Sequence, residues 1–259
     1  MDSKFEQFRN LHHRPADLFL LPNVWDARSA LLFQEQNIPA IATSSAAVAA
    51  SLGYDDGQGM PFADYLFVIS RILASVEIPV SVDMEMGYGD SDAEIIKNVL
   101  KLIDMGVVGI NLEDSTIDRS GRVLKDAKIV VRTIENIKDT LAAKGLDLFL
   151  NIRCDTFLLD VADKLPESNR RVQLYEGAGA DGVFLPCIAG EGDIAAVAGN
   201  TKLPLNVMCI PGLPGFEVLK KLGVRRVSMG PFLFNKVYDN IGRLSRAIVY
   251  NERFSPLFL

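Results

Sequence analysis

The stretch IPVSVDMEMGYGD, residues 78–90, combines a strand-like apolar run with two acids and a glycine turn. It begins as a short run of apolar and β-branched residues, which is typical of a buried strand. It then places Asp83 and Glu85 on alternate residues and turns at Gly87-Tyr88-Gly89. Residues i and i+2 of a strand share a face, so both carboxylates are expected to point to one spot. The stretch predicts a buried strand that ends in two acids.

Runs of the same kind recur along the chain and alternate with helical patterns. Eight apolar runs span residues 18–23, 39–44, 78–85, 107–114, 146–153, 181–186, 203–208 and 225–230. Helical patterns lie at 26–36, 62–76, 91–105, 127–144, 167–178, 190–198, 213–222 and 231–250. Such alternation predicts βα units, and eight of them in 259 residues are typical of a closed barrel. The predicted fold class is α/β, a (β/α)8 TIM-type barrel with an extra N-terminal helix and an extended C-terminal helix.

The chain is long enough, and at 49% hydrophobic residues apolar enough, to bury one large core. No linker, low-complexity segment or shift in composition divides it. We therefore expect a single barrel domain over residues 1–259.

Composition and charge exclude several classes of partner. The net charge is −6 and the lysines and arginines form no basic cluster, which disfavours nucleic acid. No apolar run approaches about 18 residues, and the N-terminal stretch lacks the apolar core of a signal peptide, so no membrane partner is expected. Cys154, Cys187 and Cys209 form no CxxC pair, which disfavours a disulfide framework or a structural zinc site. We expect a cytoplasmic protein that binds a small metabolite.

Most predicted strands open with apolar residues and close with polar ones. The polar closing residues are Trp25-Asp26, Ser44-Ser45, Asp83 with Glu85, Glu113-Asp114, Arg153 with Asp155, and Asn206 within its strand. Buried charges are costly unless they are paired or bind a metal, so several at one barrel mouth indicate function. The carboxyl ends of the strands are where barrel active sites lie.

Three of these acids suit a hard divalent cation. Asp83, Glu85 and Glu113 come from adjacent strands, and carboxylate oxygens are preferred ligands of Mg²⁺, for which Mn²⁺ is a possible substitute. The two histidines, His12 and His13, lie in the N-terminal segment, which weakens any zinc or histidine-base mechanism.

Structural alternatives remain open for several of these residues. Asp114 points away from its neighbour Glu113, which favours a structural role, and a role as an N-cap or as a partner of Arg153 is favoured for Asp155 over catalysis. Asp56 lies in the polar loop DDGQG, where a solvated side chain is the alternative to a functional one. Trp25 is either a wall of the site or a core residue.

Seven segments together resemble the isocitrate lyase and phosphoenolpyruvate mutase superfamily. They are residues 21–30, 42–56, 79–90, 106–115, 150–158, 179–186 and 222–231, in the order that the family has them. The resemblance covers most of the chain and implies a Mg²⁺-dependent enzyme. Such an enzyme cleaves or forms a C–C or P–C bond next to a carboxylate, through an enolate of a pyruvate-like unit.

The resemblance also implies roles for single residues. Asp83 would lie nearest the metal, which it shares with Glu85 and Glu113. The catalytic group would comprise Arg153, Glu113 and Asp56, and the substrate-binding group Trp25, Ser44, Ser45, Ala46, Arg153 and Asn206. Arg153 would bind the carboxylate or the developing oxyanion as a permanently charged donor. The last helical segment, about 231–254, would pack on a neighbouring subunit of a homotetramer or homodimer.

The sequence departs from the family pattern at three places. The segment after the fourth strand, STIDRSGRVLKDA (115–127), has no cysteine, whereas the lyase branches carry a catalytic cysteine there. Glu85 stands where the family usually has aspartate, and LPCI (185–188) lacks an acid that many members have. The cysteine-free lid disfavours isocitrate or methylisocitrate cleavage, while Arg119, Arg122, Lys125 and Lys128 keep a phosphonate substrate open.

We therefore expect a Mg²⁺-dependent lyase or hydrolase that cleaves a C–C bond in a 2-oxo or 2-hydroxy dicarboxylate, such as oxaloacetate or a substituted malate. The first alternative is a P–C bond mutase or hydrolase that acts on a phosphonopyruvate-like compound. An alternative of another class is a non-catalytic barrel that binds a metabolite.

Overall fold

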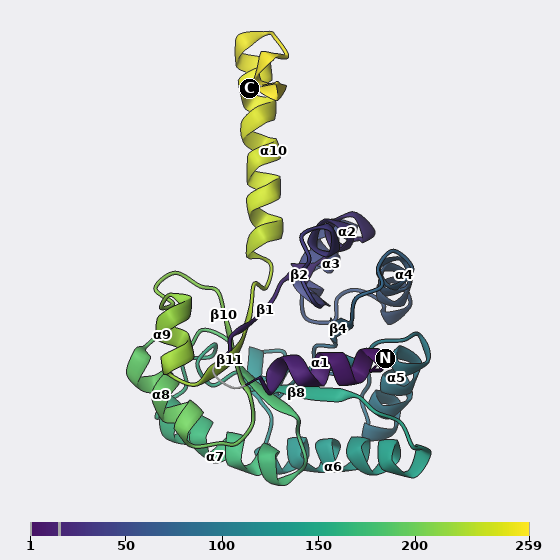
Figure 1. The fold of residues 1–259 in the computed structure, drawn as a ribbon, viewed down its shortest axis with the longest axis vertical. Coiled ribbons are helices and arrows are strands. Elements are labelled where there is room, and N and C mark those ends of the chain that lie inside the picture. The colour runs from purple at the N-terminus through teal and green to yellow at the C-terminus, as the bar shows by residue number, and fades with distance from the viewer. Residues whose placement is uncertain (1, 15–16, 259) are drawn as a thin grey trace.

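The computed structural model describes residues 2–14 and 17–258, and it folds as a parallel barrel surrounded by helices (Figure 1). The strands follow the order β1 (Phe19–Leu21), β11 (Val224–Ser228), β10 (Leu205–Met208), β9 (Gly182–Leu185), β8 (Phe149–Arg153), β5 (Gly109–Glu113), β4 (Val80–Asp83), β3 (Ile41–Thr43) and β2 (Asn23–Val24). Every neighbouring pair in this order is parallel.

The first predicted strand is split in two at Pro22, which has no N–H to donate. The first part, β1, pairs with β11, and the second part, β2, pairs with β3. The two parts thus occupy one position between the last strand and the second predicted one. This arrangement nearly closes the sheet, and it confirms the predicted (β/α)8 TIM-type architecture.

The predicted helices are present close to their expected bounds. They are α2 (Ala27–Glu35), α4 (Phe62–Leu73), α5 (Asp92–Asp104), α6 (Ala127–Lys144), α7 (Lys164–Gly177), α8 (Glu191–Gly199), α9 (Phe216–Lys221) and α10 (Phe232–Asn251). Local chemistry sets these bounds: Ser91 Oγ accepts a hydrogen bond from Glu94 N at the start of α5, and Gly145, with φ of +62°, caps the end of α6. The extra N-terminal helix is α1 (Lys4–His12).

Four elements were not expected from the periodicity. Helix α3 (Ser45–Leu52) follows β3 directly, and its alanine-rich sequence has little amphipathic pattern. The segment after β5 forms an antiparallel hairpin of β6 (Ser115–Asp118) and β7 (Gly121–Leu124). A short 3₁₀ turn, η1 (Ser255–Leu257), follows α10.

Helix α1 closes the end of the barrel opposite the carboxyl ends of the strands. Its Phe8 and Leu11 pack with Phe19 and Phe149 in a buried apolar cluster. The larger core lies between the sheet and the surrounding helices. The carboxyl ends of the strands are therefore left as the open mouth.

Helix α10 extends away from the barrel (Figure 1). Only Phe234 of this helix is buried, whereas Tyr238, Ile241 and Val249 are exposed. Its packing on a neighbouring subunit stays a prediction. Among the described residues, no helix is long and apolar enough to cross a membrane.

Candidate active site

A cavity of about 340 Å³ opens at the carboxyl ends of the strands. It contains six residues expected from the sequence, namely Ser44, Ser45, Ala46, Asp56, Asp83 and Arg153. The other lining residues are Asn23, Asn111, Arg122, Leu158, Phe184, Pro186, Met208, Ser228, Gly230 and Pro231. Four expected residues, Trp25, Glu85, Glu113 and Asn206, do not line it.

Asp83 presents an unpaired carboxylate oxygen to this mouth. Its Oδ2 accepts a hydrogen bond from Ser45 Oγ at 2.8 Å, whereas its Oδ1 is buried and has no donor among the described residues. Thr43 Oγ1 and the Tyr65 hydroxyl hold the Asp83 backbone at 3.1 and 2.9 Å. Burial raises the pKa of Asp83, although the charge of Arg153 opposes this shift. An unpaired buried anionic oxygen fits a divalent cation, with Asp56 on the same cavity as a further oxygen donor.

No group of three or more histidine, cysteine, aspartate or glutamate side chains is arranged to hold a metal among residues 2–14 and 17–258. Asp83 and Asp56 line the cavity, so a cation held there would have two carboxylates available and would keep several water ligands, as Mg²⁺ commonly does. The chemistry of the donor set fits Mg²⁺ better than zinc, because the cavity offers oxygen atoms and no imidazole.

Glu85 does not line the cavity, and its backbone is in the left-handed region, with φ of +49°. The two carboxylate oxygens accept hydrogen bonds from Gln58 N at 2.6 Å and from the Tyr88 hydroxyl. Burial raises the pKa of Glu85 to about 7. The expectation that Asp83 and Glu85 point to one spot is wrong, because the strand ends at Asp83. A role for Glu85 toward the metal through water stays a prediction.

Glu113 lies between two arginines. Its Oε1 is 2.6 Å from Arg153 Nη1, and its Oε2 accepts from Arg122. Burial raises the pKa of Glu113 to about 7, although both arginines oppose this shift. Because the arginines already occupy both oxygens, a direct metal bond would have to break an ion pair. Its predicted metal and catalytic roles stay predictions.

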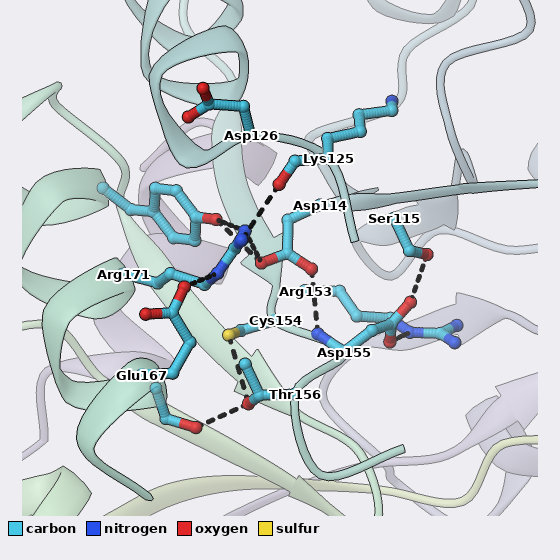
Figure 2. A network of polar contacts seen from close by, with 12 residues as sticks. Asp114, Ser115, Lys125, Asp126, Arg153, Cys154, Asp155, Thr156, Glu167 and Arg171 are labelled. Atoms are coloured by element: carbon cyan, nitrogen blue, oxygen red, sulfur yellow. Dashed lines mark hydrogen bonds and ion pairs between the residues drawn. The ribbon is translucent and has the colours of Figure 1, made fainter. Parts of the chain in front are cut away.

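Arg153 combines an ion-pair role with a place on the cavity. Its Nε donates to Asp155 Oδ1 at 2.6 Å, which matches the pairing considered from the sequence. Asp155 Oδ2 in turn accepts from Ser115 Oγ at 2.5 Å (Figure 2). The carboxylates of Glu113 and Asp155 together fix the plane of the Arg153 guanidinium, so this group is oriented before any ligand binds.

The β6–β7 hairpin places a second arginine side chain, Arg122, on the cavity that Arg153 lines. Arg122 lines the cavity, contacts Glu113, and donates from Nη1 to Ser115 Oγ at 2.9 Å. Of the lid residues considered from the sequence, Arg122 therefore reaches inward. Lys125 instead borders a neighbouring cavity of about 460 Å³ outside the barrel mouth.

The start of helix α3 borders the same cavity as Asp83, Arg122 and Arg153. Ser44 caps the helix and accepts from Ala47 N at 3.3 Å, and Ser44, Ser45 and Ala46 all line the cavity. The first N–H groups of a helix have no partner within the helix, and the helix dipole favours an anion there. This loop and helix start suit a carboxylate.

Asp114 belongs to a buried network behind the site (Figure 2). It accepts from Asp155 N at 2.9 Å, from Arg171 Nη1 at 3.1 Å and from the Tyr175 hydroxyl at 2.7 Å. Arg171 Nη2 also donates to the Lys125 carbonyl at 2.9 Å, at the end of the hairpin segment. The structural role favoured for Asp114 fits these contacts.

Two expected substrate-binding residues are occupied elsewhere. The Trp25 ring packs edge-to-face against Phe234 of α10 at 5.3 Å between ring centroids. The Asn206 amide donates to Val207 O at 2.7 Å, below the cavity lining.

Sequence reasoning missed the lining residues Asn23, Asn111 and Ser228. Strand alternation carried a signal for one of them, because Asn111 is two residues before Glu113 on one strand face. Asn23 follows Pro22 at the strand break, where alternation is interrupted.

The chain is similar to several known proteins over most of its length. Residues 8–249 match the sequence model of a family described as phosphoenolpyruvate phosphomutase. An uncharacterized protein of Mycobacterium tuberculosis is 32% identical over 246 residues, which are 95% of this chain and 90% of that protein. An oxaloacetate decarboxylase of Ectopseudomonas mendocina is 28% identical over 213 residues, covering 80% and 72% of the two chains. A solved structure from Burkholderia cenocepacia, titled as a candidate phosphonomutase, has a TM-score of 0.88 and 34% identity, with 95% and 100% coverage.

Proposed function

Because the chain belongs to the phosphoenolpyruvate phosphomutase family, within the isocitrate lyase and phosphoenolpyruvate mutase superfamily, we propose that it is a Mg²⁺-dependent carbon–carbon lyase. The proposed substrate is a small 2-oxo dicarboxylate of the oxaloacetate class, and Mn²⁺ is the proposed substitute metal. The observation that carries the proposal is the unpaired Asp83 oxygen in one cavity with two arginines and a helix start.

The charges of the cavity suit a dicarboxylate with a cation between its ends. One carboxylate would accept hydrogen bonds at the start of α3, and the other would bind Arg153 and Arg122 across the cavity. Asp83 would hold the cation, with Ser45 fixing its second oxygen. When bound, the cation would supply a Lewis acid that offsets negative charge developing on the 2-oxo oxygen.

The hairpin supports a 2-oxo substrate over a 2-hydroxy one. The hairpin residues 115–124 lack the catalytic cysteine that the lyase branches of the superfamily carry there for cleaving 2-hydroxy acids. Decarboxylation of a 2-oxo dicarboxylate needs no base, because the electron pair of the breaking bond moves into the enolate as CO₂ leaves, and the enolate then takes a proton from solvent to give pyruvate. Arg122 and Arg153 would orient the leaving carboxylate, and the hairpin would exclude water.

A phosphonopyruvate-like substrate is the second candidate. The two cations that line the cavity would suit a phosphonate as well as a carboxylate. A family relative titled as a candidate phosphonomutase supports the same alternative.

Turnover assays test the proposal. Oxaloacetate, phosphonopyruvate and alkyl malates are incubated with the protein and Mg²⁺, with metal-only controls and with excess chelator, and pyruvate and oxalate are measured. We expect release of pyruvate from oxaloacetate that the chelator stops. Asp83→Asn should lower this rate at least about 100-fold, since Lewis-acid stabilisation supplies several kcal/mol.

Equal turnover in the presence of chelator, or in Asp83→Asn, would refute the metal mechanism. Turnover of phosphonopyruvate alone would select the second candidate. Saturable binding without any turnover would instead identify a non-catalytic barrel.

We also propose that the chain assembles as a homodimer or homotetramer through α10. The proposal rests on the exposed apolar residues of this helix, which include Tyr238, Ile241 and Val249.

A further inference from the structure

A fully buried arginine lies beneath the floor of the cavity. Arg226 is on β11, is 1% exposed, and forms no ion pair with an acid among the described residues. Its Nη2 donates to Asn111 Oδ1 at 2.9 Å, its Nη1 lies 3.5 Å from His12 Nε2, and its Nε has no partner. A buried charge with neutral partners is costly to keep, so its position calls for an explanation.

Helix α1 fixes this guanidinium from below. His12 Nδ1 donates to the Phe8 carbonyl at 2.8 Å, which leaves Nε2 as the acceptor that faces Arg226. Burial, together with the charge of Arg226, holds the pKa of His12 well below its usual value. His12 is therefore a neutral acceptor, and Arg226 can only donate.

A donor-only group determines which way the Asn111 amide points. Asn111 Oδ1 accepts from Arg226 Nη2 at 2.9 Å and from Asn151 Nδ2 at 2.8 Å. Rotating the amide by half a turn would place its NH₂ group against the guanidinium, so this orientation is excluded. Nδ2 must then point away from both donors.

The free side of the Asn111 amide borders the cavity. Asn111 lines the cavity and is in register with Asp83 on the neighbouring strand. Asn111 Nδ2 donates a hydrogen bond to no protein atom in the part of the chain that the structure describes. This nitrogen is also absent from the fully buried polar atoms that lack a partner. An oriented N–H donor therefore borders the cavity on the strand beside the Asp83 carboxylate.

We propose that Asn111 is a substrate-binding residue whose Nδ2 donates a hydrogen bond to an anionic oxygen of the substrate, and that Arg226 is the positioning residue that fixes this amide. The inference rests on the proposed function, since it assumes that a carboxylate or 2-oxo oxygen lies near Asp83. The nearby guanidinium charge polarises the amide and strengthens the donor.

The test uses oxalate as the probe, titrated by calorimetry into the whole chain with MgCl₂ present. Asn111→Asp is nearly isosteric, keeps an acceptor for Arg226 and Asn151, and replaces the donor by an anionic oxygen. We expect the melting temperature to be unchanged or higher, because the new carboxylate pairs with Arg226. Oxalate should bind at least about 30-fold more weakly. Asn200→Asp, the same change at the end of α8, is the matched control and should bind like the wild type.

Arg226→Met tests the positioning role through coupling. It should weaken oxalate binding several-fold in the wild type, but by less than about 2-fold in an Asn111→Ala background, because the amide that it orients is gone. Equal effects in both backgrounds would reduce Arg226 to a structural residue and overturn that part of the proposal.

The outcomes separate this inference from the function on which it rests. Wild-type binding of oxalate together with unchanged affinity in Asn111→Asp refutes the role of Asn111 and leaves the lyase proposal standing. Failure of the wild type both to bind oxalate and to turn over any 2-oxo acid refutes the proposed function, and the inference with it.

Discussion

Replacing Arg171 by methionine removes the cation of the buried network behind the site. Arg171 Nη1 donates to Asp114 at 3.1 Å and to the Tyr175 hydroxyl at 3.1 Å, and Nη2 donates to the Lys125 carbonyl at 2.9 Å. The Arg171 side chain is 6% exposed and that of Asp114 is fully buried. Methionine fills much of the same space but leaves the Asp114 carboxylate without its counter-charge.

The expected cost follows from this burial. Removing one partner of a buried ion pair costs about 3–5 kcal/mol, because the remaining charge stays desolvated. For a chain of this size that corresponds to a fall in melting temperature of roughly 6–20 °C. The loss is measured by thermal and urea unfolding followed by circular dichroism. Hydrogen exchange should also speed up near Lys125, where the hairpin segment loses its anchor.

The adjacent arginine provides a matched control. Arg170 also contacts Glu167, at 2.7–2.8 Å, but its side chain is 53% exposed. Arg170→Met should therefore cost less than about 1 kcal/mol. Adding Asp114→Asn to Arg171→Met should recover part of the loss, since it removes the unpaired charge. If the unfolding free energies of Arg171→Met and Arg170→Met differ by less than about 1 kcal/mol, burial does not determine the cost of losing the arginine.

Three further predictions concern the site and the assembly. Arg153→Lys should weaken substrate binding about 10-fold or more and should have a smaller effect on the free energy of unfolding. The reason is that lysine cannot contact both Glu113 and Asp155 and also bind a ligand. Equal substrate affinity in both proteins would make Arg153 a structural residue. The pKa of Glu85 rises from 4.5 to about 7 on folding. Ionisation of Glu85 therefore lowers the free energy of unfolding progressively as the pH rises from 4.5 to about 7, and has no effect at lower pH. The unfolding free energy of Glu85→Gln, measured with chelator present, should therefore rise relative to the wild type by up to about 3 kcal/mol between pH 4.5 and pH 8. A difference in unfolding free energy that does not change with pH would contradict this. Ile241→Glu should reduce the oligomer mass measured by light scattering, whereas the control Asn240→Glu should not; a monomeric wild type would exclude the proposed assembly.

Local sequence patterns predicted much of the fold. Apolar runs of strand length and the helical patterns between them depend on neighbours only a few residues away, so the βα alternation could be read directly. Helix α3 was missed because its alanine-rich sequence, buried in its first half and exposed at its end, has no amphipathic period. The split of the first strand at Pro22 was also missed, although it decides how the barrel closes.

Strand-end positions likewise predicted Asp83, Ser44, Ser45 and Arg153, because parallel strands bring their carboxyl ends to one mouth. The sequence alone could not say which atoms stay free. Glu85 is satisfied by Gln58 from 27 residues away, and Asn111 is oriented by Arg226 from 115 residues away. Which oxygen lacks a donor, and which amide hydrogen faces the cavity, depends on hydrogen-bond partners that only the closed barrel brings within about 3 Å.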